Sequence, residues 1–82
     1  MDNQLRGLTT RKIEKILKHW GFKQTGQEGS HRDWEFRRKD GKLLAAVTTI
    51  ASKKEYPRGT LISIIEQSGH SEADWVAALK EI

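Results

Sequence analysis

One histidine, His31, stands where residue type and spacing could support chemistry. It follows Gly29 and Ser30 in the stretch QEGSHRDWEFRRKDG and opens a segment in which apolar and polar side chains alternate. Histidine titrates near pH ~6.5, so it can both accept and donate a proton at neutral pH. Metal-free cleavage of RNA needs such a group, to remove the 2′-hydroxyl proton and to protonate the leaving 5′-oxygen. His31 is therefore a candidate acid–base group, although a histidine at a strand start is commonly only an exposed polar residue.

Cleavage of a phosphodiester also needs cations that stabilise negative charge on the phosphoryl oxygens. Candidate donors lie on the expected sheet and in the segment before the second long helix: Arg32, Arg37, Arg38, Lys53, Lys54 and Arg58. The chain has fifteen Lys and Arg against eleven Asp and Glu. This basic balance suits a nucleic acid or an acidic protein partner. The run RRKDGK can equally be a solvated hairpin tip.

The two other histidines have structural explanations. His19 lies near a helix end, where a cation interacts favourably with the helix dipole, and His70 follows Gly69 in a corner between helices. No two histidines have the i, i+4 spacing of a helical metal pair, and the chain has no cysteine. We therefore expect neither a metal site nor a cofactor.

The hydrophobic pattern predicts the elements that position these residues. Residues 9–21 read as a helix, capped by Thr9 or Thr10 and ended by Gly21. Trp34 and Phe36 alternate with polar residues, which is typical of a half-buried strand. The full expected order is a helix at 9–21, a strand at 22–26, a turn at 27–30, a strand through 34–36, a strand at 42–50, and helices at 60–69 and 71–82.

The dipeptide Asp40-Gly41 predicts a two-residue hairpin turn in which both central residues have positive φ. At the last helix, Ser71 and Asp74 have the spacing of a capping box. The three Trp residues are expected in the core, because each falls on an apolar stripe.

Three consecutive strands between helices predict an α+β fold, with a three-stranded antiparallel meander and the helices on one face. Trp34 and Phe36 then point toward the helices, while His31 stands on the open face, or at its edge, beside a polar and partly cationic row. We expect one domain, residues 1–82. No apolar run is long enough for a membrane span and no signal peptide is recognisable, so a cytoplasmic location is expected.

Read together, several motifs resemble the HicA toxin family, also called the YcfA type. They are HWGF at the end of the first helix, GSH at residues 29–31, the DG hairpin, and PRGTLISIIEQSGHS at residues 57–71. The resemblance covers roughly residues 8–79. Each motif is short, and the specificity lies in their order and spacing.

The resemblance implies a double-stranded-RNA-binding-domain-like α-β-β-β-α fold with a short C-terminal helix. It implies an mRNA interferase held inactive by a HicB-type antitoxin, with His31 as catalytic residue and Ser30 beside it at the RNA. Many family members have a histidine after the third strand, where this chain reads TTIASKKEYP. A second acid–base group is then Lys53, Lys54 or Tyr56, or is absent.

Two other functions compete with an endoribonuclease. One is a non-catalytic RNA-binding module of the same fold, in which His31 is only one more contact. The other is an interaction domain whose basic surface meets a protein alone.

Overall fold

A computed structural model describes all residues, 1–82, as three strands and three α-helices after a short 3₁₀ turn. The elements are η1 (Asn3–Leu5), α1 (Thr10–His19), β1 (Lys23–Glu28), β2 (His31–Arg37), β3 (Leu43–Ile50), α2 (Arg58–Ser68) and α3 (Glu72–Glu81). The strands form one antiparallel sheet in the order β1-β2-β3. The expected α+β class and the three-stranded meander are therefore confirmed.

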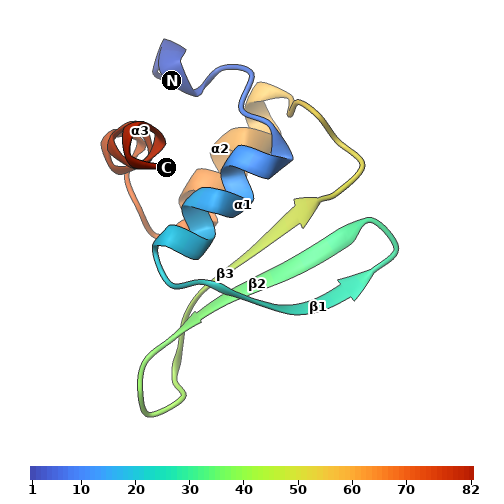
Figure 1. Cartoon of the computed structure of the whole chain (residues 1–82), viewed down its shortest axis with the longest axis vertical. Helices are drawn as coiled ribbons and strands as arrows, with labels where there is room; N and C mark the ends of the chain where they lie inside the picture. The colour runs from blue at the N-terminus through green and yellow to red at the C-terminus, as the bar shows by residue number, and fades with distance from the viewer.

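The helices cover one face of this sheet (Figure 1). α1 and α2 pack against β3, and α3 packs against α1 and η1. The hairpin between β2 and β3 projects beyond the helices, and the opposite face of the sheet carries none (Figure 1). No helix in the chain has the length and apolar character needed to cross a lipid bilayer.

The core fills the space between the helices and the inner face of the sheet. Its fully buried side chains are Leu5, Ile13, Ile16, Leu17, Trp34, Val47, Leu61 and Trp75, together with Thr49. Trp34 is 2% exposed and Phe36 packs against the core, so the predicted alternation along β2 is confirmed. Trp20 is only partly buried, because it stacks on His70 at the surface with ring centroids 3.8 Å apart.

The helix ends follow the predicted capping residues. Thr9 caps α1 by accepting a hydrogen bond from the Lys12 N–H, and Ser71 and Asp74 form the expected capping box of α3. Gly69 ends α2 in the left-handed conformation. These bonds satisfy backbone groups that a helix end leaves unpaired.

Two turns differ from the predictions. β1 continues to Glu28, which pairs directly with His31, so the turn contains only Gly29 and Ser30. In the β2–β3 hairpin, Gly41 has a φ of 91° and Asp40 has no positive φ. The predicted two-residue turn is therefore wrong. A turn over residues 39–40 is followed by a left-handed glycine, which gives a three-residue loop closed by Arg38 and Lys42.

Candidate functional site

His31 is the first residue of β2, directly after the tight turn at Gly29 and Ser30. Gly29 has a φ of 59°, a backbone conformation that other residues rarely adopt. The His31 side chain is exposed and makes no hydrogen bond within the protein, which leaves both ring nitrogens free for a substrate. Its place on the open face matches the predicted alternation.

The residues around His31 on the open face are acidic or neutral. His31 lines a hollow of about 490 Å³ together with Glu28, Asp33 and Thr48. The Thr48 hydroxyl donates a 3.1 Å hydrogen bond to Asp33 Oδ1. Arg37, the cation of the predicted row, lies six residues along the strand, roughly 20 Å away. A phosphate that crossed this hollow would meet two carboxylates, so an anionic ligand has to approach His31 from another side.

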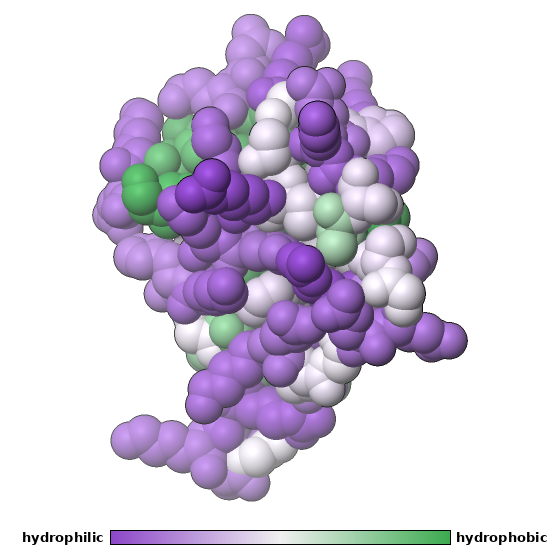
Figure 2. All heavy atoms as spheres, turned by 45° about the vertical axis from the view of Figure 1, so that its right-hand side comes forward, coloured by the Kyte–Doolittle hydropathy of each residue, from purple (hydrophilic) through white to green (hydrophobic).

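That other side is the loop after β3. The Ala51 N–H donates a 2.6 Å hydrogen bond to the Ser30 carbonyl, and His31 pairs with Ile50 in the sheet register. The turn that presents His31 and the loop that carries Lys53 are therefore held together. This end of the molecule comes forward in Figure 2, where its surface is mostly purple and white with little green.

The loop after β3 borders a basic groove of about 540 Å³ between α1 and the sheet. We define the basic groove by its cationic side chains: Arg11, Lys15, Lys18, Arg32, Lys53 and Lys54. The only acidic side chain that lines it is Glu14. Like-charged groups gathered in one hollow attract an anion from solution and bind a polyanionic backbone.

A buried polar chain fixes the wall of the groove. Arg32 Nη1 donates to Glu14 Oε1 at 2.6 Å, and the Thr49 hydroxyl donates to Glu14 Oε2 at 2.7 Å. Trp34 Nε1 in turn donates to the Thr49 hydroxyl at 3.0 Å. Glu14 is only 8% exposed. Most of the charge of Arg32 is therefore neutralised within the protein. Arg32 helps to form the wall of the groove and is less available to donate hydrogen bonds to a phosphate.

The loop that carries Lys53 and Lys54 is fastened from inside. The Tyr56 hydroxyl lies 2.6 Å from the Thr10 hydroxyl, accepts a bond from the Ile50 N–H at 3.1 Å, and is almost completely buried. Thr10 also donates to the carbonyls of Ile50 and Lys53. Tyr56 thus holds the loop against α1, and its hydroxyl is buried and engaged in these hydrogen bonds instead of facing the open side of the sheet.

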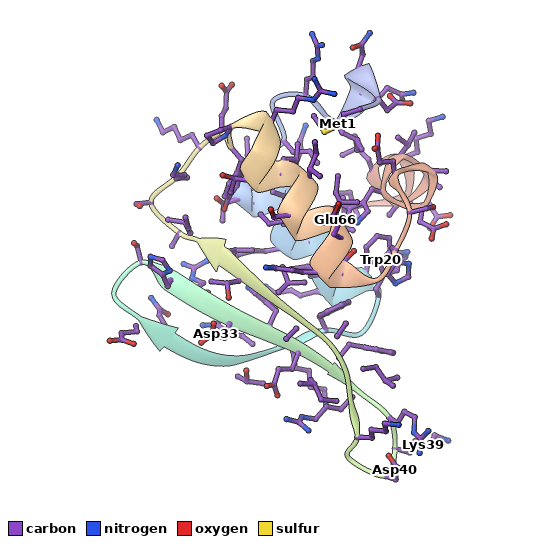
Figure 3. All side chains as sticks on the ribbon, turned by 180° about the vertical axis from the view of Figure 1, so that it is seen from behind. Met1, Trp20, Asp33, Lys39, Asp40 and Glu66 are labelled. Carbon is purple, nitrogen blue, oxygen red and sulfur yellow. The ribbon has the colours of Figure 1, made fainter.

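The other predicted RNA-binding residues lie apart from His31. Arg37 donates to Glu35 and to the Gly41 carbonyl, and Arg38 is paired with Asp40, so both hold the hairpin. Figure 3 shows the hairpin tip, with Lys39 and Asp40, at the end of the sheet far from the helices.

Arg58 begins α2 and lines a separate hollow with Arg6 and Tyr56. Of the predicted donors, Ser30, Arg32, Lys53 and Lys54 therefore lie at the His31 end of the sheet. The structure does not bring Arg37, Arg38 or Arg58 to that position.

Three cations of the groove were not predicted. Arg11, Lys15 and Lys18 lie on α1 at i, i+4 and i+7, which places them on one face of the helix. That spacing was visible in the sequence, and so was the position of Glu14 on the inner stripe with Ile13 and Leu17. Lys18 also lies 5.6 Å from the ring centre of Trp34.

A family model decides the identity of the chain. The model of the HicA toxin of bacterial toxin–antitoxin systems matches residues 10–70, from the start of α1 to the corner between α2 and α3. The chain belongs to this family. It is therefore the toxin of a toxin–antitoxin system, and membership in the HicA family implies an antitoxin partner. A comparison with curated proteins finds no match.

Proposed function

We propose that this HicA toxin is a metal-independent endoribonuclease that cleaves mRNA, with His31 as the catalytic residue and a HicB-type antitoxin as its inhibitor. The observation that carries the proposal is the Ala51–Ser30 hydrogen bond, which joins the turn before the exposed His31 to the loop that lines a basic groove. A free imidazole next to a polyanion-binding groove is the minimal arrangement for cleavage through a 2′-hydroxyl.

The proposed reaction needs one group that exchanges protons. His31 takes the proton from a 2′-hydroxyl, and the oxygen attacks the adjacent phosphorus. The bond from phosphorus to the 5′-oxygen breaks, and the leaving 5′-oxygen takes up a proton from the imidazolium. The products are a 2′,3′-cyclic phosphate and a 5′-hydroxyl, so no water or metal ion enters this step. Lys53 and Lys54 supply positive charge for the phosphoryl oxygens.

Single-stranded mRNA is the substrate that fits this chemistry. In-line attack needs a backbone that can be splayed away from helical geometry, and base-paired RNA resists this. The phosphates enter over the loop after β3, because Glu28 and Asp33 repel them on the open face. The backbone then continues along Lys15 and Lys18 of α1.

The test measures cleavage of a single-stranded RNA by the purified toxin in the presence of EDTA. We expect His31→Ala to lower the rate roughly 10²–10⁴-fold, as loss of an acid–base group does, while RNA affinity changes little. His19→Ala is the matched control, because His19 is also exposed but bonds to Glu81 at the far end of α1. Equal activity of both variants would contradict the assignment. Induced expression of the same variants in cells, followed by growth and mRNA integrity, tests the toxin itself.

The non-catalytic RNA-binding module remains a second candidate, because the basic groove alone accounts for RNA binding. It predicts salt-dependent binding of any RNA and no cleavage by the native chain. An interaction domain that meets only a protein predicts no RNA affinity at all.

A further inference from the structure

The two edges of the sheet are protected to different degrees. β1 carries Lys23 and Glu28 and contains a register shift between Gln24 and Gly26. Charges and bulges of this kind discourage pairing with another strand. The other edge, β3, has the sequence LLAAVTTI and has no charged residue over its whole length. β3 is therefore the edge at which a further strand can be added.

The backbone of β3 has unpaired groups along that edge. The N–H of Ile50 bonds to Tyr56, and its carbonyl accepts bonds from Thr10 and Lys53, so both groups face away from β2. Because outward-facing groups recur at every second residue of an edge strand, those of Thr48 and Ala46 face outward as well. No hydrogen bond from outside the sheet reaches the backbone of residues 43–49. Two residues thus present two donors and two acceptors to solvent.

The side chains around these groups are apolar and accessible. Leu43 and Leu44 are 43% and 49% exposed, and they are two of the three large hydrophobic residues exposed in the chain. Ala46 and Thr48 are exposed as well. This half of β3 belongs to the hairpin that projects beyond the helices (Figure 1). Nothing in the chain itself covers it.

Charge at the two ends of the strand selects the occupant. The net-positive hairpin, with Arg38, Lys39 and Lys42, flanks one end, and Lys53 and Lys54 flank the other. Antiparallel pairing of two copies through Ala46 and Thr48 would place the basic hairpin of each copy beside the basic loop of the other. Such like-charge contacts oppose self-association. A neutral strand with acidic residues at both ends fits in either direction.

We propose that the edge of β3 receives, by strand addition, an uncharged β-strand with acidic flanks from the antitoxin partner. This inference rests on the proposed function, in that it names the surface by which the toxin is neutralised. Main-chain hydrogen bonds give such a contact its affinity, and charge complementarity at both ends of the strand gives it selectivity. The added strand would lie about 10 Å from β2, two strand spacings away. An occupant of this edge lies next to the open face that carries His31, so the rest of the antitoxin can extend over that face.

The experiment joins a strand peptide to the C-terminus of the full chain. The peptide has seven alternating Val and Thr residues between pairs of Glu, and a Gly/Ser linker of about 20 residues gives it a reach of roughly 25 Å. Tethering raises the effective concentration to about the millimolar range, so weak pairing becomes measurable. NMR hydrogen exchange is measured for each backbone amide. We expect the amides of Ala46 and Thr48 to exchange roughly tenfold more slowly than in the untethered chain.

Two control peptides leave the toxin unchanged. One replaces every Val and Thr with Pro, which removes all backbone donors of the strand, and the other replaces each Glu with Lys. Three results would overturn the proposal. They are protection of Ala46 and Thr48 that persists with the Pro peptide, protection with the Lys peptide equal to that with the Glu peptide, and protection at β1 in place of β3. The absence of protection at Ala46 and Thr48 would overturn it as well. Protection in the untethered chain that grows with concentration as the mass doubles would assign the edge to a second copy.

Failure of this inference is distinguishable from failure of the proposed function. Cleavage of single-stranded RNA is measured on the untethered chain and on His31→Ala. Cleavage that depends on His31, without protection at Ala46 and Thr48, retains the nuclease and rejects strand addition. Protection without any cleavage retains the docking edge and rejects the nuclease.

Discussion

The basic groove makes a quantitative prediction about RNA binding. Five of its cations have no carboxylate partner: Arg11, Lys15, Lys18, Lys53 and Lys54. Arg32 is omitted because Glu14 neutralises it. Each phosphate contact to a single strand contributes about −0.7 to the slope of log affinity against log salt, so five contacts give about −3.5. Affinity should then fall about 100-fold between roughly 50 and 200 mM salt.

The perturbation is the double variant Lys15→Ala, Lys18→Ala. It removes two of the five contacts, so the slope should fall to about −2.1 and the loss over the same salt range to about 20-fold. The matched control is Lys12→Ala, Lys80→Ala, which removes the same charge. Lys12 lies on the same helix but does not line the groove, and Lys80 lies on α3.

The assay is fluorescence anisotropy with a labelled 2′-O-methyl RNA, which cannot be cleaved through its 2′-oxygen. Binding is titrated at several salt concentrations for the native chain and for both variants. An unchanged slope in the Lys15, Lys18 variant, or an equal decrease in the control, would refute the groove as the path of the RNA backbone.

Three further predictions concern stability. Arg32→Ala leaves Glu14 buried without its cation. Because the Arg32 side chain is 32% exposed, we expect the free energy of unfolding to fall by only about 2–3 kcal/mol, measured as a fall of roughly 10–20 °C in Tm. A change in Tm of under a few degrees would mean that the pair is not coupled. Gly29→Ala should lower the free energy of unfolding by about 1–2 kcal/mol in chemical denaturation, because φ is positive there while a Cβ would meet no atom within 4 Å. Gly29→Asn should lower it less. Equal losses for the two variants would mean that the cost comes from a steric contact of the side chain and not from the backbone conformation. Hydrogen bonds from Arg38 and then from the Lys42 N–H lower the pKa of Asp40 below 3.8. The stabilisation that Asp40 gives to the hairpin is therefore present above pH 3.8 and is lost as the pH falls through the lowered pKa. Carbon-detected NMR titration should show the lowered pKa of Asp40, and Arg38→Ala should return it toward 3.8.

Most of the architecture could be predicted because local signals agreed with one another. The apolar spacing of α1, the alternation at Trp34 and Phe36, and the caps at Ser71 and Gly69 each point to the observed element. The DG dipeptide was misleading. Its glycine does take positive φ, but Asp40 stays in the ordinary region, and the sequence does not reveal whether a hairpin loop has two residues or three.

The candidate site was less predictable, since it depends on contacts between distant segments. The position of His31 on the open face followed from the period of the strand. The position of Glu28 beside His31 could not be predicted, because β1 is longer than expected and its pairing with β2 extends to the turn. The role of Tyr56 was hidden as well, since its partners Thr10 and Ile50 are known only once α1 lies against the sheet.

The hydrogen bonds at Thr10 also bear on when the basic groove of the toxin is complete. Thr10 and Lys53 are 43 positions apart, so the two walls of the basic groove leave the ribosome at different times. At about 5–20 residues per second, the second wall follows the first by roughly 2–9 s. Until then, the cations of α1 have no opposite wall and His31 has no loop beside it. The basic groove is therefore a late feature of synthesis, because it exists only once the segment around Lys53 has reached α1.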